Sequence, residues 1–489
     1  MAERFDNFLS INPSATCFDV LSKGMYHHLF PRHLEISPRL NDVYELALAF
    51  YESQILTDEE IIQNGAYFIR VGDRYSRHFQ ICTGNSVLLP KHASSRLKSF
   101  FKTNLFRTGY ATHGLFPYRG KFHPQMIKAL MNIMGLKPGD TVLDPMMGSG
   151  TVPIEACLMG IKSIGFDASP FCRFMAQTKF NALTLPRKYI HIALQNPDHI
   201  FKHFVEQMGH PVQNSTHCDK QNRKTNMDAS HSLFDCPEPI REMSGCHQSD
   251  IYNFLLLAYL DSVGYCERSK SNSPITQFRS ILERYFFVVE KIQRVMESQD
   301  FGVGEAMILE GDARTLSIGN QSVDGILFSP PYSFAIDYLK NDAFHLEAMG
   351  VNTSALREKM VGLRGRTLRD KFDLYIKDMD DVLCECARVL KPNRFCTIVV
   401  GTNDNQLSKA LGIPAEEVPG LHQVLIEKAL KYGFSLVRAL ARRISGIANT
   451  MRDEYIIIFQ KNDLVAKGMD LSGSKDTAIS EQQTGWDPI

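Results

Sequence analysis

The chain has 489 residues, 44% of them hydrophobic, so it is long enough to bury a large core and to form two or three domains. Its 54 basic and 54 acidic residues balance, so the net charge provides no overall attraction to polyanions. Any surface that binds nucleic acid must therefore be local. Eleven scattered cysteines, no secretory leader and no apolar run of about 20 residues predict a reduced, cytoplasmic protein without a membrane span.

Residues 1–112 form a first block with its own alternation of apolar and polar positions. This alternation predicts a helix over residues 40–51 and strands over residues 66–71 and 79–82. The sequence of this accessory block does not indicate its role. Target recognition, support of the neighbouring domain and contact with a second copy all remain open.

A short apolar run over residues 140–143 predicts a buried strand that leads into a glycine-rich turn. The turn comprises Asp144, Pro145, Met146, Met147, Gly148, Ser149, Gly150 and Thr151. Gly148 and Gly150 allow positive φ and close approach of backbone amides to a ligand, and helical spacing begins at Thr151. An NAD site has the same geometry, but Asp144 would repel a pyrophosphate and attract a cationic, amine-bearing ligand. S-adenosylmethionine is such a ligand.

The next strand signal, over residues 162–166, ends at Asp167. An acid at this place in a βαβ unit accepts hydrogen bonds from ribose hydroxyls. Asp167 follows Gly148 by 19 positions, close to the roughly 20 of a nucleotide-binding unit. Taken alone this signal is weak, because any strand-to-helix turn can need glycine.

Residues 185–301 depart from the strand and helix alternation. Their polar part, residues 206–250, predicts an exposed or disordered linker, and the part that follows has helical spacing. Two interpretations are equally open: the insertion reads the sequence of a target, or it covers the sheet. The histidines and cysteines of the linker are too widely spaced for a zinc site, so no metal is predicted.

A further strand signal, over residues 323–328, leads into a second turn made of Ser329, Pro330, Pro331 and Tyr332. The prolines fix φ and remove backbone donors, so the carbonyls of Ser329 and Pro330 are held as acceptors. An amino group on a base needs acceptors to orient it and a ring to stack against, which this turn supplies. The plain alternative is a proline-rich strand exit with a packed tyrosine. The glycine-rich turn in the same chain weighs against that alternative.

A basic segment follows the second turn. Its cations are Arg357, Lys359, Arg364, Arg366, Arg369 and Lys371. A solvated helix face has a similar charge density, but the position beside the second turn favours contact with phosphates that flank an extruded nucleotide. We expect a mobile, cationic loop here.

The two turns together resemble the amino-methyltransferases of nucleic acids, the cytosine-N4 and adenine-N6 enzymes. In that family the first turn binds S-adenosylmethionine and the second binds the target base. The Ser-Pro-Pro-Tyr form looks most like the cytosine-N4 branch. The resemblance implies further cofactor contacts from Lys121, His123 and Pro124 and from Asp312, which corresponds to the family's adenine-binding acid. It covers residues 114–460 apart from the insertion.

The order of the turns departs from the commonest cytosine-N4 arrangement, because here the cofactor turn comes first. Adenine-N6 enzymes and the guanine-N2 methyltransferases of transfer RNA share this order. Ser329 favours cytosine, since those other enzymes more usually carry an acid at this place. The resemblance thus implies a DNA methyltransferase of a restriction-modification system, with a cognate endonuclease encoded elsewhere. RNA as the substrate, a catalytically silent nucleic-acid-binding protein and an NAD-linked dehydrogenase are the alternatives.

The implied architecture is a class I methyltransferase fold, a Rossmann-like α/β sheet that is mostly parallel, with an N-terminal α+β block and a helical insertion. Its strands are expected near Val142, Ile164, Met307, Ile326 and Ile398, and a closing hairpin around residues 444 and 457. The predicted divisions are the accessory block 1–112, the methyltransferase parts 113–184 and 302–461, the insertion 185–301 and a flexible tail 462–489.

Overall fold

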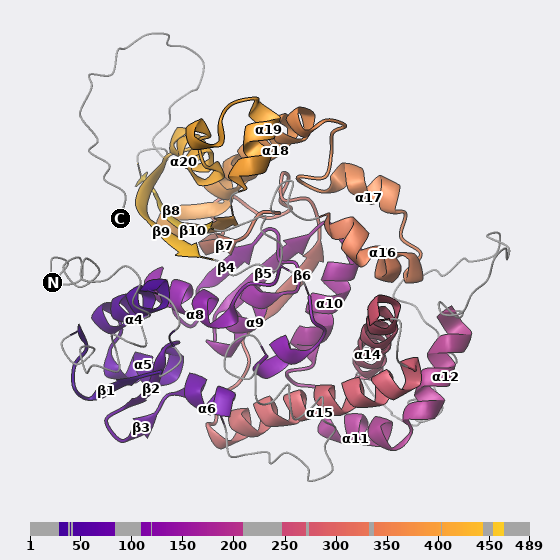
Figure 1. The fold of residues 1–489 in the computed structure, drawn as a ribbon. Helices are drawn as coiled ribbons and strands as arrows, with labels where there is room; N and C mark the ends of the chain where they lie inside the picture. The colour runs from indigo at the N-terminus through magenta and orange to yellow at the C-terminus, as the bar shows by residue number, and fades with distance from the viewer. Residues whose placement is uncertain are drawn as a thin grey trace, which may run out of the picture.

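The computed structural model describes residues 29–37, 40, 43–83, 109–118, 120–208, 247–269, 273–331, 337–401, 403–443 and 453–463. Its centre is a seven-stranded sheet (Figure 1). In spatial order the strands are β6 (Ala306–Glu310), β5 (Lys162–Asp167), β4 (Thr141–Asp144), β7 (Val323–Phe328), β8 (Leu390–Gly401), β10 (Asp453–Lys461) and β9 (Phe434–Arg443). Neighbours from β6 to β8 are parallel, and β10 is antiparallel to both β8 and β9.

This strand order confirms the predicted class I methyltransferase fold. The strands expected near Val142, Ile164, Met307, Ile326 and Ile398 are all present, and β10 contains Ile457. Residue 444 lies outside the described residues. Because parallel strands are covered on both faces, they form short, nearly continuous apolar runs, as the fully buried β7 does.

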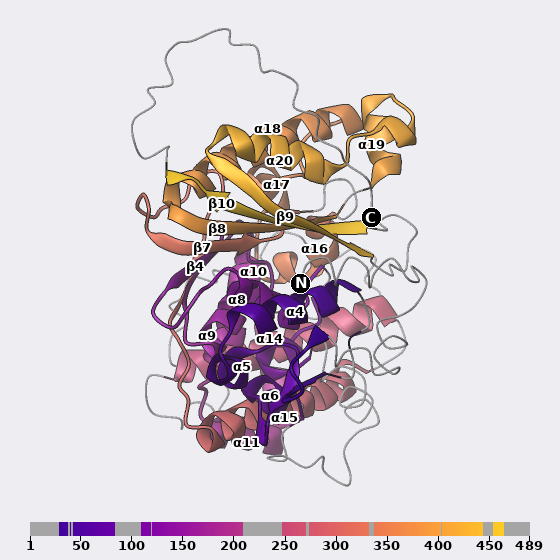
Figure 2. The same ribbon diagram turned by 90° about the vertical axis from the view of Figure 1, so that its left-hand side faces the viewer.

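Alternate side chains of the strands pack into cores on opposite faces of the sheet. Val142 and Leu327 belong to the core shared with the helices α8 (Pro124–Ile133) and α9 (Thr151–Leu158). Leu143 and Ile326 belong to the core under α18 (Leu368–Val389) and α20 (Leu421–Lys431). Figure 2 shows α18, α20 and α19 (Asp404–Leu411) on one side of the sheet and α8 on the other. The alternation follows from the two-residue period of a strand.

The N-terminal block packs against α8. Its described residues form a small antiparallel sheet and three helices. These elements are β1 (Leu34–Ile36), α4 (Val43–Ile55), α5 (Asp58–Asn64), β2 (Phe68–Val71), β3 (Arg74–Tyr75) and α6 (Arg77–Thr83). The side-chain amide of Gln125 donates to the carbonyl of Ala66 at 2.9 Å, and that of Asn132 donates to Glu52 Oε1 at 2.6 Å. Polar contacts therefore cross this seam as well as apolar ones.

The strand predicted over residues 79–82 was wrong, because these residues lie in α6. The hydroxyl oxygen of Ser76 accepts a hydrogen bond from the backbone N–H of Phe79 at 3.1 Å, as a helix-capping serine does. His78, Ile81 and Cys82 then form the buried side of the helix, with a spacing of three and four residues.

A buried charge cluster joins α9 to the segment before α8. Glu155 of α9 lies 2.6 Å from Nε2 of His113 and 3.6 Å from Nζ of Lys128, and all three side chains are buried. Burial alone would raise the pKa of Glu155, but Lys128 and His113 lower that pKa to about 2. The helix that follows the glycine-rich turn is thus anchored by an ionised carboxylate.

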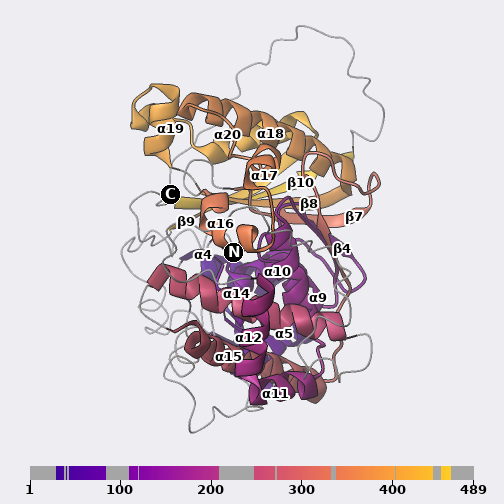
Figure 3. The ribbon, with the colours of Figure 1, turned by 90° about the vertical axis from the view of Figure 1, so that its right-hand side faces the viewer.

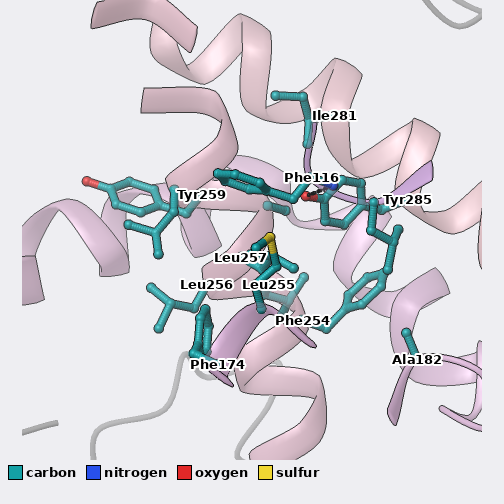
Figure 4. Close-up of a cluster of buried hydrophobic side chains, with 14 of the residues drawn as sticks. Phe116, Phe174, Ala182, Phe254, Leu255, Leu256, Leu257, Tyr259, Ile281 and Tyr285 are labelled. Carbon is teal, nitrogen blue, oxygen red and sulfur yellow. Dashed lines mark hydrogen bonds between the residues drawn. The ribbon is translucent and has the colours of Figure 1, made fainter. Parts of the chain in front are cut away.

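The insertion is helical on both sides of residues 209–246, which the structure does not describe. Its long helices pack beside α10 (Pro170–Asn181) and α16 (Tyr338–Ala348). The helices of its described residues are α11 (Arg187–Gln195), α12 (Pro197–Met208), α14 (Gln248–Ser269) and α15 (Pro274–Ser298). Together with α10 they enclose a large apolar core, part of which Figure 4 shows. Figure 3 shows α14 beside α10 and α16. Within the described chain, no helix is both long enough and apolar enough to span a bilayer.

Candidate functional site

The two turns meet at one cavity, at the carboxyl ends of β4 and β7. Gly148 of the first turn lines it, and so do Ser329 and Pro331 of the second. The other predicted site residues that line this cavity are Lys121, Pro145, Met146, Ser149, Thr151, Asp167, Asp312 and Lys359. Residues 148 and 331 are therefore brought together although the insertion separates them in the chain.

Several predicted site residues do not line the cavity. These are His123, Pro124, Asp144, Gly150 and Pro330, together with Arg357, Arg364, Arg366 and Arg369 of the basic segment. Tyr332 lies outside the described residues. Asp144 is buried beneath the turn, where its Oδ1 accepts a hydrogen bond from the backbone N–H of Met146 at 3.0 Å. Its position suits a role in shaping the turn.

The first turn has the backbone that its glycines allow. Gly148 and Gly150 have φ values of 50° and 79°. A Cβ at Gly150 would lie 2.8 Å from the Cβ of Ala176 in α10, so a side chain has no space there. The backbone N–H of Met147 donates to the carbonyl of Phe166 at 2.8 Å, which fastens the turn to β5. α9 then begins directly at the cavity.

Asp167 at the end of β5 faces this turn. Its two carboxylate oxygens accept hydrogen bonds from the backbone N–H groups of Gly148 and Ser169, both at 2.8 Å. Burial raises the pKa of Asp167 to about 6 and that of Asp144 well above its usual value. A cationic ligand in the cavity would favour the ionised form of both acids. The site therefore fits a ligand that combines positive charge with hydroxyl groups.

Lys121 lines the same cavity from the segment before α8. Its Nζ donates to the carbonyl of His113 at 3.0 Å. Burial lowers the pKa of Lys121 to about 7. A ligand carboxylate beside Lys121 would restore its charge, so this side of the cavity fits an anionic group.

Asp312, just after β6, belongs to a charge network that reaches α18. Arg314 forms hydrogen bonds to both oxygens of Asp312 and, at 2.9 Å, to Asp378 of α18. Burial alone would raise the pKa of Asp312. The hydrogen bonds and the positive charge of Arg314 have the larger effect, so the pKa is lowered. Asp378 also pairs with Arg364 of the basic segment. The predicted adenine contact is thus a carboxylate held in place by a guanidinium.

The basic segment is more ordered than expected. Helix α17 (Thr353–Lys359) precedes α18, and three of the cations form ion pairs. Arg357 pairs with Asp337 at 2.9 Å, Arg369 pairs with Asp373 at 3.0 Å, and Arg364 pairs with Asp378. We expected a mobile, cationic loop, but residues 357–359 belong to α17 and residues 368–371 to α18, and acids of this chain pair with three of the cations. Contact of the segment with phosphates stays a prediction. Arg366 is exposed.

Sequence reasoning missed Tyr118 and Tyr338, two aromatic residues that line the cavity. A Cβ at Gly148 would lie 3.7 Å from the ring of Tyr118, and one at Gly120 would lie 3.3 Å from the hydroxyl oxygen of Tyr338. The tyrosines are therefore close neighbours of the glycines that line the cavity. The only sequence signal was the aromatic pair around Pro117, just before Lys121. Among the described residues, no group of His, Cys, Asp and Glu side chains is placed to hold a metal ion.

Comparisons with known proteins agree with this geometry. Residues 115–203, which include the first turn, match the family model of the RMKL-like methyltransferase domain. The type II methyltransferase M.MjaII of Methanocaldococcus jannaschii is 23% identical, over 70% of this chain and 78% of its own. M.BsoBI of Geobacillus stearothermophilus is 25% identical, over 54% of this chain and 57% of its own.

A shorter match points to a transfer RNA enzyme. The tRNA (guanine(10)-N2)-dimethyltransferase of Methanothermobacter thermautotrophicus is 42% identical over 52 residues, 11% of this chain and 16% of its own.

Among solved structures, TrmN from Thermus thermophilus aligns with a TM-score of 0.29 and 13% identity, over 70% of this chain and 50% of its own. The family model and the curated relatives agree with what the two turns indicated. Residues 115–203 match a methyltransferase domain, and the chain as a whole is similar to type II methyltransferases.

Proposed function

We propose that this protein transfers a methyl group from S-adenosylmethionine to an exocyclic amino group in DNA, at N4 of cytosine. The observation that carries the proposal is the shared cavity, which Gly148 lines from one turn and Ser329 and Pro331 line from the other. A methyl donor bound by the first turn would meet a base held by the second. Such proximity is the main requirement of a direct transfer between two bound groups.

The residues of the cavity fit S-adenosylmethionine. Asp167, Asp312 and Lys121 all line the cavity. In the proposed complex Asp167 would accept hydrogen bonds from ribose hydroxyls, Asp312 would contact the adenine and Lys121 would pair with the methionine carboxylate. Burial raises the pKa of Asp167, and the positive charge of the bound donor would favour its ionised form. When bound, the cofactor supplies an electrophilic methyl group on its sulfonium sulfur.

The second turn would prepare the amino group for attack. The nitrogen is a poor nucleophile while its lone pair is delocalised into the ring of the base. Acceptors at Ser329 and, as the resemblance implies, at the Pro330 carbonyl would draw the amino group towards tetrahedral geometry. The nitrogen would then form a bond to the donor's methyl carbon as the sulfur–carbon bond breaks, and the proton released from the nitrogen would pass to solvent. Stacking of the base on Tyr332 remains a prediction from the family.

Cytosine is favoured by Ser329, and DNA by the similarity to two type II methyltransferases. Adenine N6 is the nearest alternative within the same chemistry. The second candidate function is methylation of guanine N2 in transfer RNA. It is favoured by the 52-residue match to the transfer RNA enzyme and by the order of the two turns.

The test is to incubate the purified protein with S-adenosylmethionine labelled in the methyl group and with either unmethylated DNA or total RNA. Digestion to nucleosides and chromatography then identify the labelled product. We expect N4-methylcytosine from DNA. N6-methyladenine or N2-methylguanine would overturn the choice of base, and no label in either polymer would overturn the proposed function.

Variants of the second turn separate transfer from cofactor binding. We expect Ser329→Ala and Tyr332→Ala to be nearly inactive while their affinity for S-adenosylmethionine in calorimetry stays that of the wild type. Equal loss of binding and transfer would instead indicate misfolding of the site. Glu416→Gln, an exposed change distant in sequence, is the control for activity lost during purification.

A further inference from the structure

Arg314, two residues after Asp312, joins three segments of the chain beside the cavity. Its Nε and Nη2 donate to the two carboxylate oxygens of Asp312, at 2.9 and 2.7 Å. Its Nη1 donates to Oδ1 of Asp378 in α18 at 2.9 Å, and Nη2 also donates to the backbone carbonyl of Lys359 at 3.0 Å. Only 15% of the Arg314 side chain is exposed. One guanidinium therefore connects the end of β6, the end of α17 and the side of α18.

The segment that begins at the end of α17, residues 359–363, extends from this guanidinium to the second turn. Lys359, Met360 and Val361 line the cavity. Gly362 has a φ of 82°, and a Cβ there would lie 3.8 Å from the Cβ of Pro331. Residues 359–363 thus contact Arg314 at one end and the turn proposed to hold the base at the other.

Asp312 depends on Arg314 more than Asp378 does. In the part of the chain that the structure describes, the hydrogen bonds to the Asp312 carboxylate come from the backbone N–H and the guanidinium of Arg314. Asp378 is also paired with Arg364, so α18 keeps a partner without Arg314. Loss of the guanidinium would release the Asp312 carboxylate and the Lys359 carbonyl together.

We propose that Arg314 is a positioning residue that couples the binding of S-adenosylmethionine to the binding of the target DNA. The inference rests on the proposed function, in which Asp312 contacts the adenine of the cofactor. Asp312, once fixed by that contact, holds Arg314, and Arg314 holds residues 359–363 beside Pro331. The DNA then meets a segment that is already ordered and loses less conformational entropy on binding. Because coupling between two sites is reciprocal, DNA tightens the binding of the cofactor by the same factor.

The test measures this factor by calorimetry with sinefungin, an analogue of S-adenosylmethionine that has no transferable methyl group. Its Kd is measured alone and with a saturating DNA duplex, chosen because it accepts label from S-adenosylmethionine in the transfer assay. We expect DNA to lower the Kd of sinefungin for the wild type by about 5- to 150-fold.

Arg314→Lys keeps a positive charge beside Asp312, but an ammonium group cannot bridge three acceptors as a planar guanidinium does. We expect this variant to bind sinefungin alone within about tenfold of the wild type. The ratio of its two Kd values should fall to less than about two, since the link to residues 359–363 is lost. Arg314→Gln, which removes the charge as well, should show the same loss of coupling.

Arg388→Lys is the matched control. Arg388 of α18 also bridges a carboxylate, that of Glu385, and two backbone carbonyls, those of Leu316 and Ile318. It does not line the cavity. We expect Arg388→Lys to lower the thermal midpoint about as much as Arg314→Lys does and to keep the wild-type ratio of Kd values.

An Arg314→Lys protein with the wild-type ratio overturns the inference, and so does an equal loss of the ratio in Arg388→Lys. A wild type that methylates DNA but binds sinefungin equally with and without the duplex overturns it without any variant, and the proposed function then stands. A wild type that labels no DNA fails at the earlier step, the proposed function itself.

Discussion

The hydroxyl oxygen of Tyr285 accepts a hydrogen bond of 2.9 Å from the backbone N–H of Phe116, which lies 169 positions earlier in the chain (Figure 4). Tyr285 is part of α15 in the insertion, and Phe116 stands two residues before Tyr118. The same hydroxyl donates to Asp261 of α14 at 3.4 Å, and Asp261 also pairs with Arg284. The insertion therefore holds the segment that brings Tyr118 to the wall of the cavity.

Removing this hydroxyl should weaken cofactor binding. Tyr285→Phe leaves a buried N–H without its acceptor, at a cost of about 1 to 3 kcal/mol. We expect a several-fold rise in the Kd for S-adenosylmethionine by calorimetry and a lower thermal midpoint. Tyr259→Phe is the matched control, because the buried Tyr259 hydroxyl has no hydrogen-bond partner among the described residues. If both variants bind the cofactor alike, the contact with Phe116 does not position the wall.

The glycine at the start of α9 should tolerate no side chain. Gly150→Ala combines a left-handed backbone with a contact of 2.8 Å to Ala176. Gly412→Ala isolates the first effect, since Gly412 has a φ of 72° and a Cβ there would meet no atom within 4 Å. We expect Gly412→Ala to cost about 1 kcal/mol of stability and Gly150→Ala to cost more and to reduce cofactor affinity. Thermal unfolding and calorimetry measure both effects. Equal midpoints would contradict the steric argument.

The basic segment should divide into phosphate-binding and structural cations. We expect Arg366→Ala to keep its stability and to reduce the slope of log Kd against log salt for DNA by about one. Arg364→Ala should instead lower the thermal midpoint, because Asp378, which is 2% exposed, loses one of its two guanidinium partners. Fluorescence anisotropy across a salt series measures the slope. A slope unchanged in Arg366→Ala would exclude its contact with phosphate.

Glu52 should make stability depend on pH. Chiefly because of burial, its pKa is raised from 4.5 to about 7, even though Asn132 and Ala66 donate hydrogen bonds to it. Between these two values the unfolded chain is ionised while the native carboxyl keeps its proton, so native stability falls as the pH rises. Relative to the wild type, the free energy of unfolding of Glu52→Gln should rise by up to about 1.4 kcal/mol per pH unit from pH 4.5 to 7. Above pH 7 the difference should stay constant. Denaturant unfolding at several pH values measures this difference, and a difference that is also constant below pH 7 would rule the titration out.

Much of the fold could be predicted because parallel strands leave a strong local signal. Val142, Ile164 and Ile326 each stand in a short apolar run that ends in a turn, and each lies in the predicted strand. The error over residues 79–82 had a local cause, since the apolar residues there fit a strand until the capping hydroxyl of Ser76 is considered. Short apolar runs do not distinguish the two structures.

Site residues could be predicted only where several functional residues are adjacent in the sequence. The residues of the two turns stand together in sequence, and the sheet brings their strand ends to one edge. The contact between Tyr118 and Asp342 joins residues 224 positions apart, and neither has a distinctive neighbour in sequence. The pairing of Arg364 with Asp378 was hidden for a similar reason, because a helical acid gives no sign of which cation it will meet.

The amides of Gln125 and Asn132 have a consequence for how this protein can change over evolutionary time. Apolar surfaces tolerate many replacements of similar volume, but a buried amide must keep a partner of matching polarity. Gln125 bonds to a backbone carbonyl, which any residue at position 66 provides, whereas Asn132 bonds to the side chain of Glu52. We therefore expect positions 52 and 132 to be substituted together when the N-terminal block diverges.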